Sequence, residues 1–96
     1  MHVSFSDCVR VAPDVLFRLV SDEGVLVNLN TEMYLGLNPV GARMWHVLIE
    51  ASSIQAAYEQ LLKEYDVEPS ELRRDLEDFI AQLQAHQLIE TRPDAA

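Results

Sequence analysis

Few side chains in this sequence could take part in chemistry, and their spacing does not assemble a catalytic centre. The three histidines, His2, His46 and His86, lie far apart, and no pair has the spacing of metal ligands on a shared face. Cys8 is the only cysteine, so it cannot form an internal disulfide, and as a nucleophile it would need a base beside it. We therefore expect no catalytic residue, no metal and no cofactor, in a protein that is not an enzyme.

Acidic residues are common, but they do not pair like catalytic acids. Glu71, Asp75, Glu77 and Asp78 have the distribution of a solvated helix face. The chain has seven Lys and Arg residues against sixteen Asp and Glu residues, which gives a formal charge of −9. Nucleic acids and anionic membranes are bound by stripes of Lys and Arg, and here the basic residues are scattered. Neither nucleic acid nor membrane is therefore an expected partner.

The length of the chain limits its complexity. At 96 residues, a single core absorbs most of the apolar side chains and leaves little room for a buried cleft. Neither a signal-peptide pattern nor an apolar run of about 18 residues is present. We expect one domain over residues 1–96, with its core at 16–90, a flexible tail at 91–96 and a cytoplasmic location.

Three short runs in the first half have the composition or the alternation of β-strands. Residues 16–20 are rich in apolar side chains and are followed by the turn sequence SDEG. Residues 25–30 alternate with the period of a half-buried strand, and residues 33–37 form a third run after the polar turn NTE. These runs predict an antiparallel three-stranded meander. Residues 1–14 give weaker signals, so a short edge strand and a loosely held arm both stay open.

The second half has helical periodicity with recognisable helix starts. Asn38 precedes a proline, which pairs a favourable N-cap with a favourable first helical residue. Ser52 and Gln55 have the spacing of a capping box and predict a second helix. A third helix is expected to begin at Pro69 and to end near His86. Three strands followed by three helices indicate an α+β fold, with the helices packed on one face of the sheet.

The last predicted strand, residues 33–37, is a sheet edge with neither charge nor proline. Sheet edges are usually protected by charge, proline or a bulge. The N-terminal arm covers this edge, or the edge is simply short, or it is kept open to accept a peptide as an extra strand. An open edge also permits a strand-paired homodimer, so the oligomeric state is not determined by the sequence.

Beyond these patterns, the chain resembles a known family. The run VLVNLNTEMYLGLNPVGARMWHVL and the later run SIQAAYEQLLKEYDVEPSELRRDLEDFIAQLQAHQLIE are similar to PqqD-like domains. These small domains bind leader peptides in the biosynthesis of ribosomally made, post-translationally modified peptides. The resemblance covers about residues 16–90. Its most specific element is the Leu37 and Asn38 pair, followed by a small-residue turn and the dipeptide MW.

The resemblance implies a winged helix-turn-helix-like fold in which the leader adds as an antiparallel strand to the third strand. The leader would lie in the groove between that strand and the third helix. Carried onto this sequence, Gly36 would allow close backbone approach and Tyr34 would offer an aromatic surface. The peptide-binding residues implied on the strand are Met33, Tyr34, Leu35, Gly36 and Leu37, and the groove-facing residues expected on the third helix are Arg73, Glu77, Ile80 and Gln84.

Two pathways fit this resemblance. The free-standing size and the segment YLGLNPVGAR look most like the leader-binding protein of lasso-peptide pathways, which delivers the precursor to a leader peptidase and then a cyclase. The alternative is a chaperone that presents a precursor to a radical SAM enzyme in pyrroloquinoline quinone biosynthesis. A DNA-binding winged helix is less favoured, because the predicted second helix, SIQAAYEQLLKEYD, has one lysine against three acids.

Overall fold

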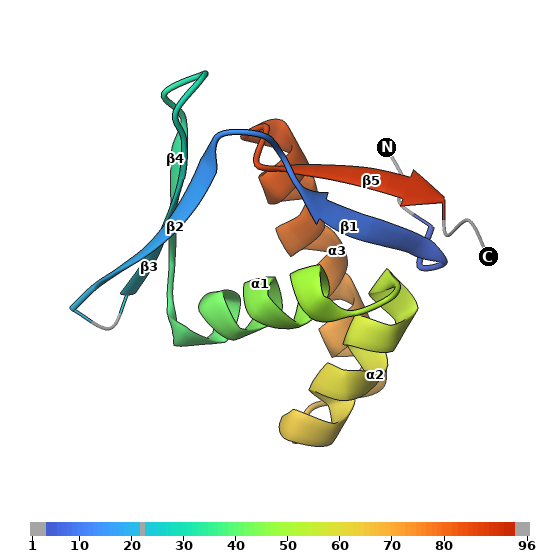
Figure 1. Cartoon of the computed structure of the whole chain (residues 1–96). Coiled ribbons are helices and arrows are strands. Elements are labelled where there is room, and N and C mark those ends of the chain that lie inside the picture. Colours follow the sequence, from blue (N-terminus) through green and yellow to red (C-terminus); the bar gives the residue numbers. More distant parts are fainter. Residues whose placement is uncertain (1–3, 22, 94–96) are drawn as a thin grey trace.

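The chain folds into two small antiparallel sheets and three helices (Figure 1). The computed structural model describes residues 4–21 and 23–93. In chain order the elements are β1 (Asp7–Val11), β2 (Val15–Val20), β3 (Glu23–Asn28), β4 (Tyr34–Leu37), α1 (Pro39–Glu50), α2 (Ile54–Glu64), α3 (Pro69–Ala85) and β5 (Ile89–Pro93). The predicted α+β fold, a three-stranded antiparallel sheet followed by three helices, is confirmed.

The predicted meander is formed by β2, β3 and β4, in that order. β3 ends at Asn28, earlier than predicted, because the Asn28 side chain folds the following residues into a turn. Its Oδ1 atom accepts hydrogen bonds from the backbone N–H groups of Asn30 at 2.9 Å and Thr31 at 3.1 Å. Its Nδ2 atom donates to the Gln87 carbonyl at 2.7 Å. This buried amide therefore ties the β3–β4 turn to the turn that follows α3.

A second sheet, which was not predicted, pairs the two ends of the described chain. β1 runs antiparallel to β5, with Val9 opposite Thr91 at the centre (Figure 1). Phe5 and Val9 are buried in the hydrophobic core. The backbone carbonyl of Phe5 also accepts a hydrogen bond of 2.7 Å from the N–H of Gln55, which holds the segment before β1 against α2.

This second sheet corrects the predicted limits of the core. Residues 7–11 form a strand, so of the two possibilities left open for the N-terminal part, the edge strand is right for this segment and the loose arm is wrong. Residues 91–93 belong to β5 instead of the predicted tail. The predicted core of 16–90 is therefore too narrow at both ends. Residues 1–3 and 94–96 lie outside the described residues.

The helix starts agree with the sequence prediction at two of three positions. Asn38 caps α1, and its Oδ1 atom accepts an early backbone N–H at 2.8 Å. α2 is capped by Ser53, not by Ser52 as the capping-box spacing indicated, and its side chain accepts a backbone N–H at 3.1 Å. α3 begins at Pro69 as predicted and ends at Ala85.

The helices are shared between the two sheets, and the prediction that they pack together on one face of the meander is wrong. α1 contacts β1, β3 and β4, α2 contacts β1, and α3 contacts β5 (Figure 1). The largest fully buried side chains are Leu26, Leu48, Ile54, Leu61, Leu76, Ile80, Leu83 and Leu88. Their removal from water is the main favourable contribution to folding. Among the described residues, no helix is long and apolar enough to cross a membrane.

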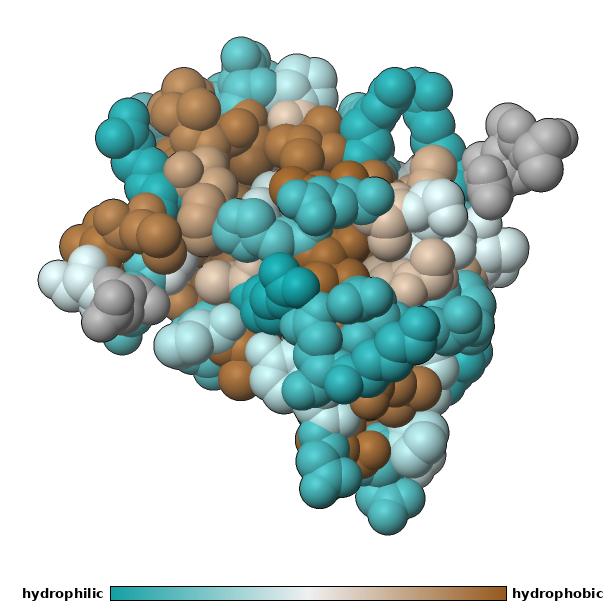
Figure 2. Space-filling model, turned by 60° about the horizontal axis from the view of Figure 1, so that its bottom comes forward, coloured by the Kyte–Doolittle hydropathy of each residue, from teal (hydrophilic) through white to brown (hydrophobic). Residues whose placement is uncertain are grey.

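The outward face of the meander is apolar as well as the inward face. Leu26 and Asn28 are buried on the inward face of β3, whereas Val25 and Val27 are half-buried on the outward face. Beside them on that face, Leu16 of β2 is 40% exposed. Figure 2 shows hydrophobic surface gathered on the left of the molecule, where the meander lies. The predicted alternation of residues in β3 is confirmed. The alternation alone does not say which of the two faces is buried.

Candidate functional site

One edge of β4 has no partner strand among the described residues, and the register determines which backbone groups it presents. The N–H of Asn28 donates to the carbonyl of Met33 at 2.8 Å, so these two residues form a hydrogen-bonded pair. In an antiparallel ladder such pairs alternate with non-hydrogen-bonded pairs. Leu35 and Leu37 therefore direct their backbone groups to β3. Tyr34 and Gly36 direct theirs to the open edge.

The side chains of β4 divide between the core and solvent. Leu37 is buried and Leu35 is half-buried, and both lie on the inward face of the meander. Tyr34 lies on the outward face and is 70% exposed. Gly36 also faces outward, and a Cβ atom built on it would have no heavy atom within 4 Å apart from those of Gly36 and its two chain neighbours. Met33 is half-buried and precedes the strand. The outward face of β4 is therefore open at both Tyr34 and Gly36.

A groove runs beside this edge, between the β4–α1 junction and α3. Its volume is about 310 Å³. Met44 of α1 and Phe79 of α3 are almost fully buried and supply apolar surface to the groove. The complete lining comprises Gly36, Leu37, Asn38, Val40, Gly41 and Met44 on one side and Asp75, Asp78, Phe79 and Gln82 on the other. An open strand edge and a partly apolar groove thus lie next to each other.

The residues predicted on α3 to face this groove lie elsewhere. Ile80 is completely buried in the core. The guanidinium of Arg73 lies 4.0 Å from the centre of the Phe5 ring and pairs with Glu77 at 3.4 Å. The Nε2 atom of Gln84 is 3.4 Å from the Thr91 Oγ1 atom, beside β5. None of these four predicted residues is among the described residues that line the groove, and their part in peptide binding stays a prediction.

The α3 residues that do line the groove were missed by the sequence analysis. The sequence predicts that Asp75 and Asp78 belong to a solvated helix face. Together with Gln82 they lie on one flank of the buried stripe of α3. Of the predicted residues, Arg73, Glu77 and Gln84 lie on the other flank, and Ile80 belongs to the stripe itself. Helical spacing places residues on both flanks of α3 equally well. The sequence therefore has no signal that says which flank faces the groove.

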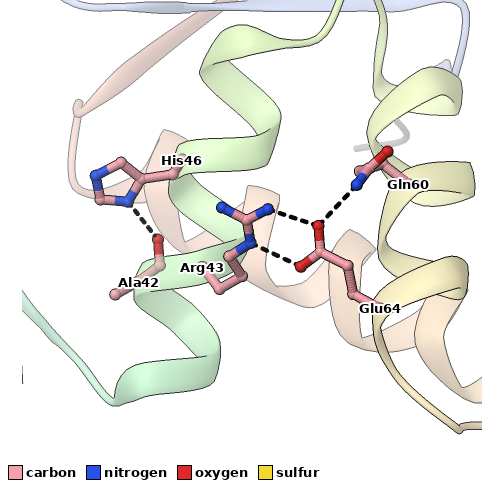
Figure 3. A network of polar contacts seen from close by, with 5 residues as sticks. All are labelled: Ala42, Arg43, His46, Gln60 and Glu64. Atoms are coloured by element: carbon pink, nitrogen blue, oxygen red, sulfur yellow. Dashed lines mark hydrogen bonds and ion pairs between the residues drawn. The ribbon is translucent and has the colours of Figure 1, made fainter.

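An ion pair holds the groove wall formed by α1 against α2 (Figure 3). The Nε and Nη2 atoms of Arg43 donate to the two carboxylate oxygens of Glu64 at 2.7 and 2.6 Å. Gln60 donates a further hydrogen bond to Glu64 at 2.8 Å. The hydrogen bonds from Arg43, followed by that from Gln60, lower the pKa of Glu64 from 4.5 to about 2. The same pair raises the pKa of Arg43.

The described residues contain no group of three or more His, Cys, Asp or Glu side chains that could hold a metal ion. His46 has structural partners instead. Its Nδ1 atom is 2.8 Å from the carbonyl oxygen of Ala42 (Figure 3). Its ring packs edge-on against Phe17, with 4.8 Å between the ring centres. These contacts explain the position of His46 without any ligand.

Comparison with known proteins gives one family and two solved structures. The family model described as coenzyme PQQ synthesis protein D (PqqD) matches residues 23–89. The structure of TbiB1 in complex with the TbiA(beta) leader peptide has a TM-score of 0.76 and 33% sequence identity, covering 84% of this chain and 94% of that one. A lasso peptide synthetase B1 complexed with the leader peptide has the same fold, with a TM-score of 0.76, 22% identity and coverage of 85% and 96%. No curated protein sequence matches.

Proposed function

The chain belongs to the PqqD family, and on this premise we propose that it binds the leader segment of a ribosomally synthesised precursor peptide in a lasso-peptide pathway. The single observation that carries the proposal is the open edge of β4 beside a groove. A leader-bound relative that is 33% identical over 84% of this chain supports it.

In this proposal the leader adds to β4 as an antiparallel strand. Tyr34 and Gly36 are two residues apart, so their outward N–H and C=O groups match alternate residues of an incoming strand. Main-chain hydrogen bonds of this kind give affinity with little sequence preference. Successive side chains of the added strand point to opposite faces. One set therefore contacts the groove at Met44 and Phe79, and the other lies on the same face as Tyr34.

The role of the domain is to present the bound precursor, and the chemistry belongs to the receiving enzyme. We propose a leader peptidase as that enzyme, because both solved neighbours are leader-bound proteins and one of them is named lasso peptide synthetase B1. The description of the family model favours a second candidate, a chaperone for the precursor of pyrroloquinoline quinone. Both candidates use the same strand edge, and they differ in which precursor binds.

Gly36→Pro and Gly36→Ala form a matched pair that tests strand addition. Proline removes the outward N–H of residue 36 and leaves the β3–β4 ladder intact, because this N–H is not directed to β3. Alanine adds a Cβ atom in open space and keeps the N–H. We expect the proline variant to bind leader peptides at least about tenfold more weakly, and the alanine variant to bind within about twofold of wild type.

The probes are fluorescent leader peptides of lasso-peptide precursors, beginning with the TbiA(beta) leader, and the readouts are anisotropy and backbone amide shifts. The shifts are expected first at Tyr34 and Gly36. Urea unfolding of both variants checks that each is folded. Equal binding by the two variants, or shifts confined to α2, would contradict strand addition. A precursor of pyrroloquinoline quinone that binds while no lasso leader does would favour the second candidate.

A further inference from the structure

We propose that the groove beside β4 selects leaders that carry a basic side chain, and that Asp75 and Asp78 are the residues that make this selection. The inference rests on the proposed function, because it assumes that the leader occupies this groove. It adds the chemical class of one leader residue, which neither the fold nor the strand edge specifies.

Asp75 and Asp78 are placed together on the groove side of α3. They are three residues apart, which puts their side chains next to each other on one helix surface. Both line the groove, and no Lys or Arg is among the described residues that do so. The opposite wall, from β4 and α1, contributes only uncharged side chains such as Val40 and Met44. The two carboxylates therefore set the sign of the charge in the groove.

The fold does not use these carboxylates. Within residues 4–21 and 23–93, the ion pairs join Arg43 to Glu64 and Arg73 to Glu77. Asp75 and Asp78 take part in neither pair, and both are exposed. Arg74 is the basic residue nearest to them in sequence, and it forms no ion pair with either. Binding a cationic group here would thus break no existing ion pair of the described chain.

The N-terminus of α1 is the other electrostatic feature of the groove. Helix N-termini carry roughly half a positive charge. Asn38 already accepts a backbone N–H at this end, which satisfies one of its free donors. Two full negative charges on α3 outweigh this partial positive charge. The groove therefore favours a cationic side chain of the leader and disfavours an acidic one.

The groove also fits the shape of a basic side chain. Lys and Arg have long apolar stems that pack on apolar surface while the charged end stays near water. Phe79 supplies apolar surface on the same helix, one residue from Asp78. The stem of a leader Lys or Arg can therefore contact Phe79 while its charged end reaches the carboxylates at the exposed rim.

Selection from a displayed library of random 12-residue peptides tests the inference without knowledge of the natural leader. With the wild-type chain as bait, we expect the enriched peptides to share a Lys or Arg at one fixed position. With Asp75→Asn/Asp78→Asn as bait, this enrichment is lost. A wild-type-selected peptide is expected to bind the double variant about fivefold more weakly, as for ion pairs open to solvent.

The matched control is Glu23→Gln/Asp66→Asn, which changes the net charge equally at two exposed residues outside the groove. This control is expected to keep the enrichment and to bind the selected peptide within about twofold of wild type. Urea unfolding confirms that each variant is folded. A selected peptide whose basic residue is replaced by methionine is expected to lose about fivefold in affinity for wild type and almost nothing for Asp75→Asn/Asp78→Asn.

The outcomes separate this inference from the proposed function. Selected peptides that shift the amides of Tyr34 and Gly36 but share no basic residue would overturn the inference and leave strand addition intact. The same holds if the double variant and the control behave alike. If no selected peptide shifts those two amides, the proposed function fails and the inference fails with it.

Discussion

The two flanks of α3 border the same row of buried side chains, yet one is covered by the chain and the other is open. On the covered flank, Arg73 lies over the Phe5 ring and Gln84 reaches Thr91 of β5. On the open flank, Asp75 and Gln82 face the groove beside β4. The difference lies in what packs against each flank. The segment before β1 and strand β5 cover one side, and no strand of the described chain covers the other.

On the covered flank, α3 is stabilised by contacts with the segment before β1. Phe5 is buried beside α2 and packs edge-on against Tyr58, with 5.7 Å between ring centres. Arg73 completes this contact from α3 at 4.0 Å. On the open flank, a partner from outside the described chain would supply the equivalent contacts. The comparison therefore predicts that changes on the covered side affect stability, and changes on the open side affect binding.

The largest expected effect separates a core position from a groove position on α3. Ile80 is completely buried, so Ile80→Ala is expected to lower the free energy of unfolding by about 2–5 kcal/mol. Gln82→Ala lies on the open flank and is expected to change it by less than about 0.5 kcal/mol. Urea denaturation measures both. If the two variants were equally stable, the assignment of these residues to core and groove would be wrong.

A smaller effect on the free energy of unfolding is expected at Asn28, which joins the β3–β4 turn to the turn that follows α3. Asn28→Ala removes the donor to the Gln87 carbonyl and the acceptor for the Asn30 and Thr31 N–H groups. Leaving such buried groups unpaired is expected to cost about 1–3 kcal/mol of unfolding free energy. Asn30→Ala, at an exposed neighbouring position, is the control. Equal unfolding midpoints for the two variants would show that the Asn28 contacts do not hold the hairpin.

The smallest expected effect on stability depends on pH. It concerns the ion pair between Arg43 and Glu64, which holds the α1 wall of the groove against α2. The pKa of Glu64 is lowered to about 2, so its pairing with Arg43 stabilises the folded chain fully above about pH 5. This contribution is lost as the pH falls from 4.5 towards 2, when Glu64 becomes protonated. Glu64→Gln should therefore be less stable than wild type at pH 7, and the difference should shrink across that interval. A difference that is constant with pH would contradict the ion pair.

Much of the fold could be predicted because its signals are local. The meander, the Asn38 cap and the start of α3 at Pro69 all depend on neighbouring residues, and all were confirmed. The β1–β5 sheet was missed because it pairs residues 7–11 with 89–93, and each run is too short to predict its distant partner. The capping residue of α2 was missed by one position, since two adjacent serines offer the same side chain.

The candidate site was predicted only in part, for a related reason. The sequence by itself determined that a third helix begins at Pro69, and that the run before Asn38 is an uncharged strand edge. Which flank faces β4 depends on how α3 packs against the rest of the chain, and helical periodicity is the same for both. Which N–H groups point outward depends on the pairing of Asn28 with Met33, because a strand alone has no preferred side for its hydrogen bonds. Only the tertiary structure decided these two points.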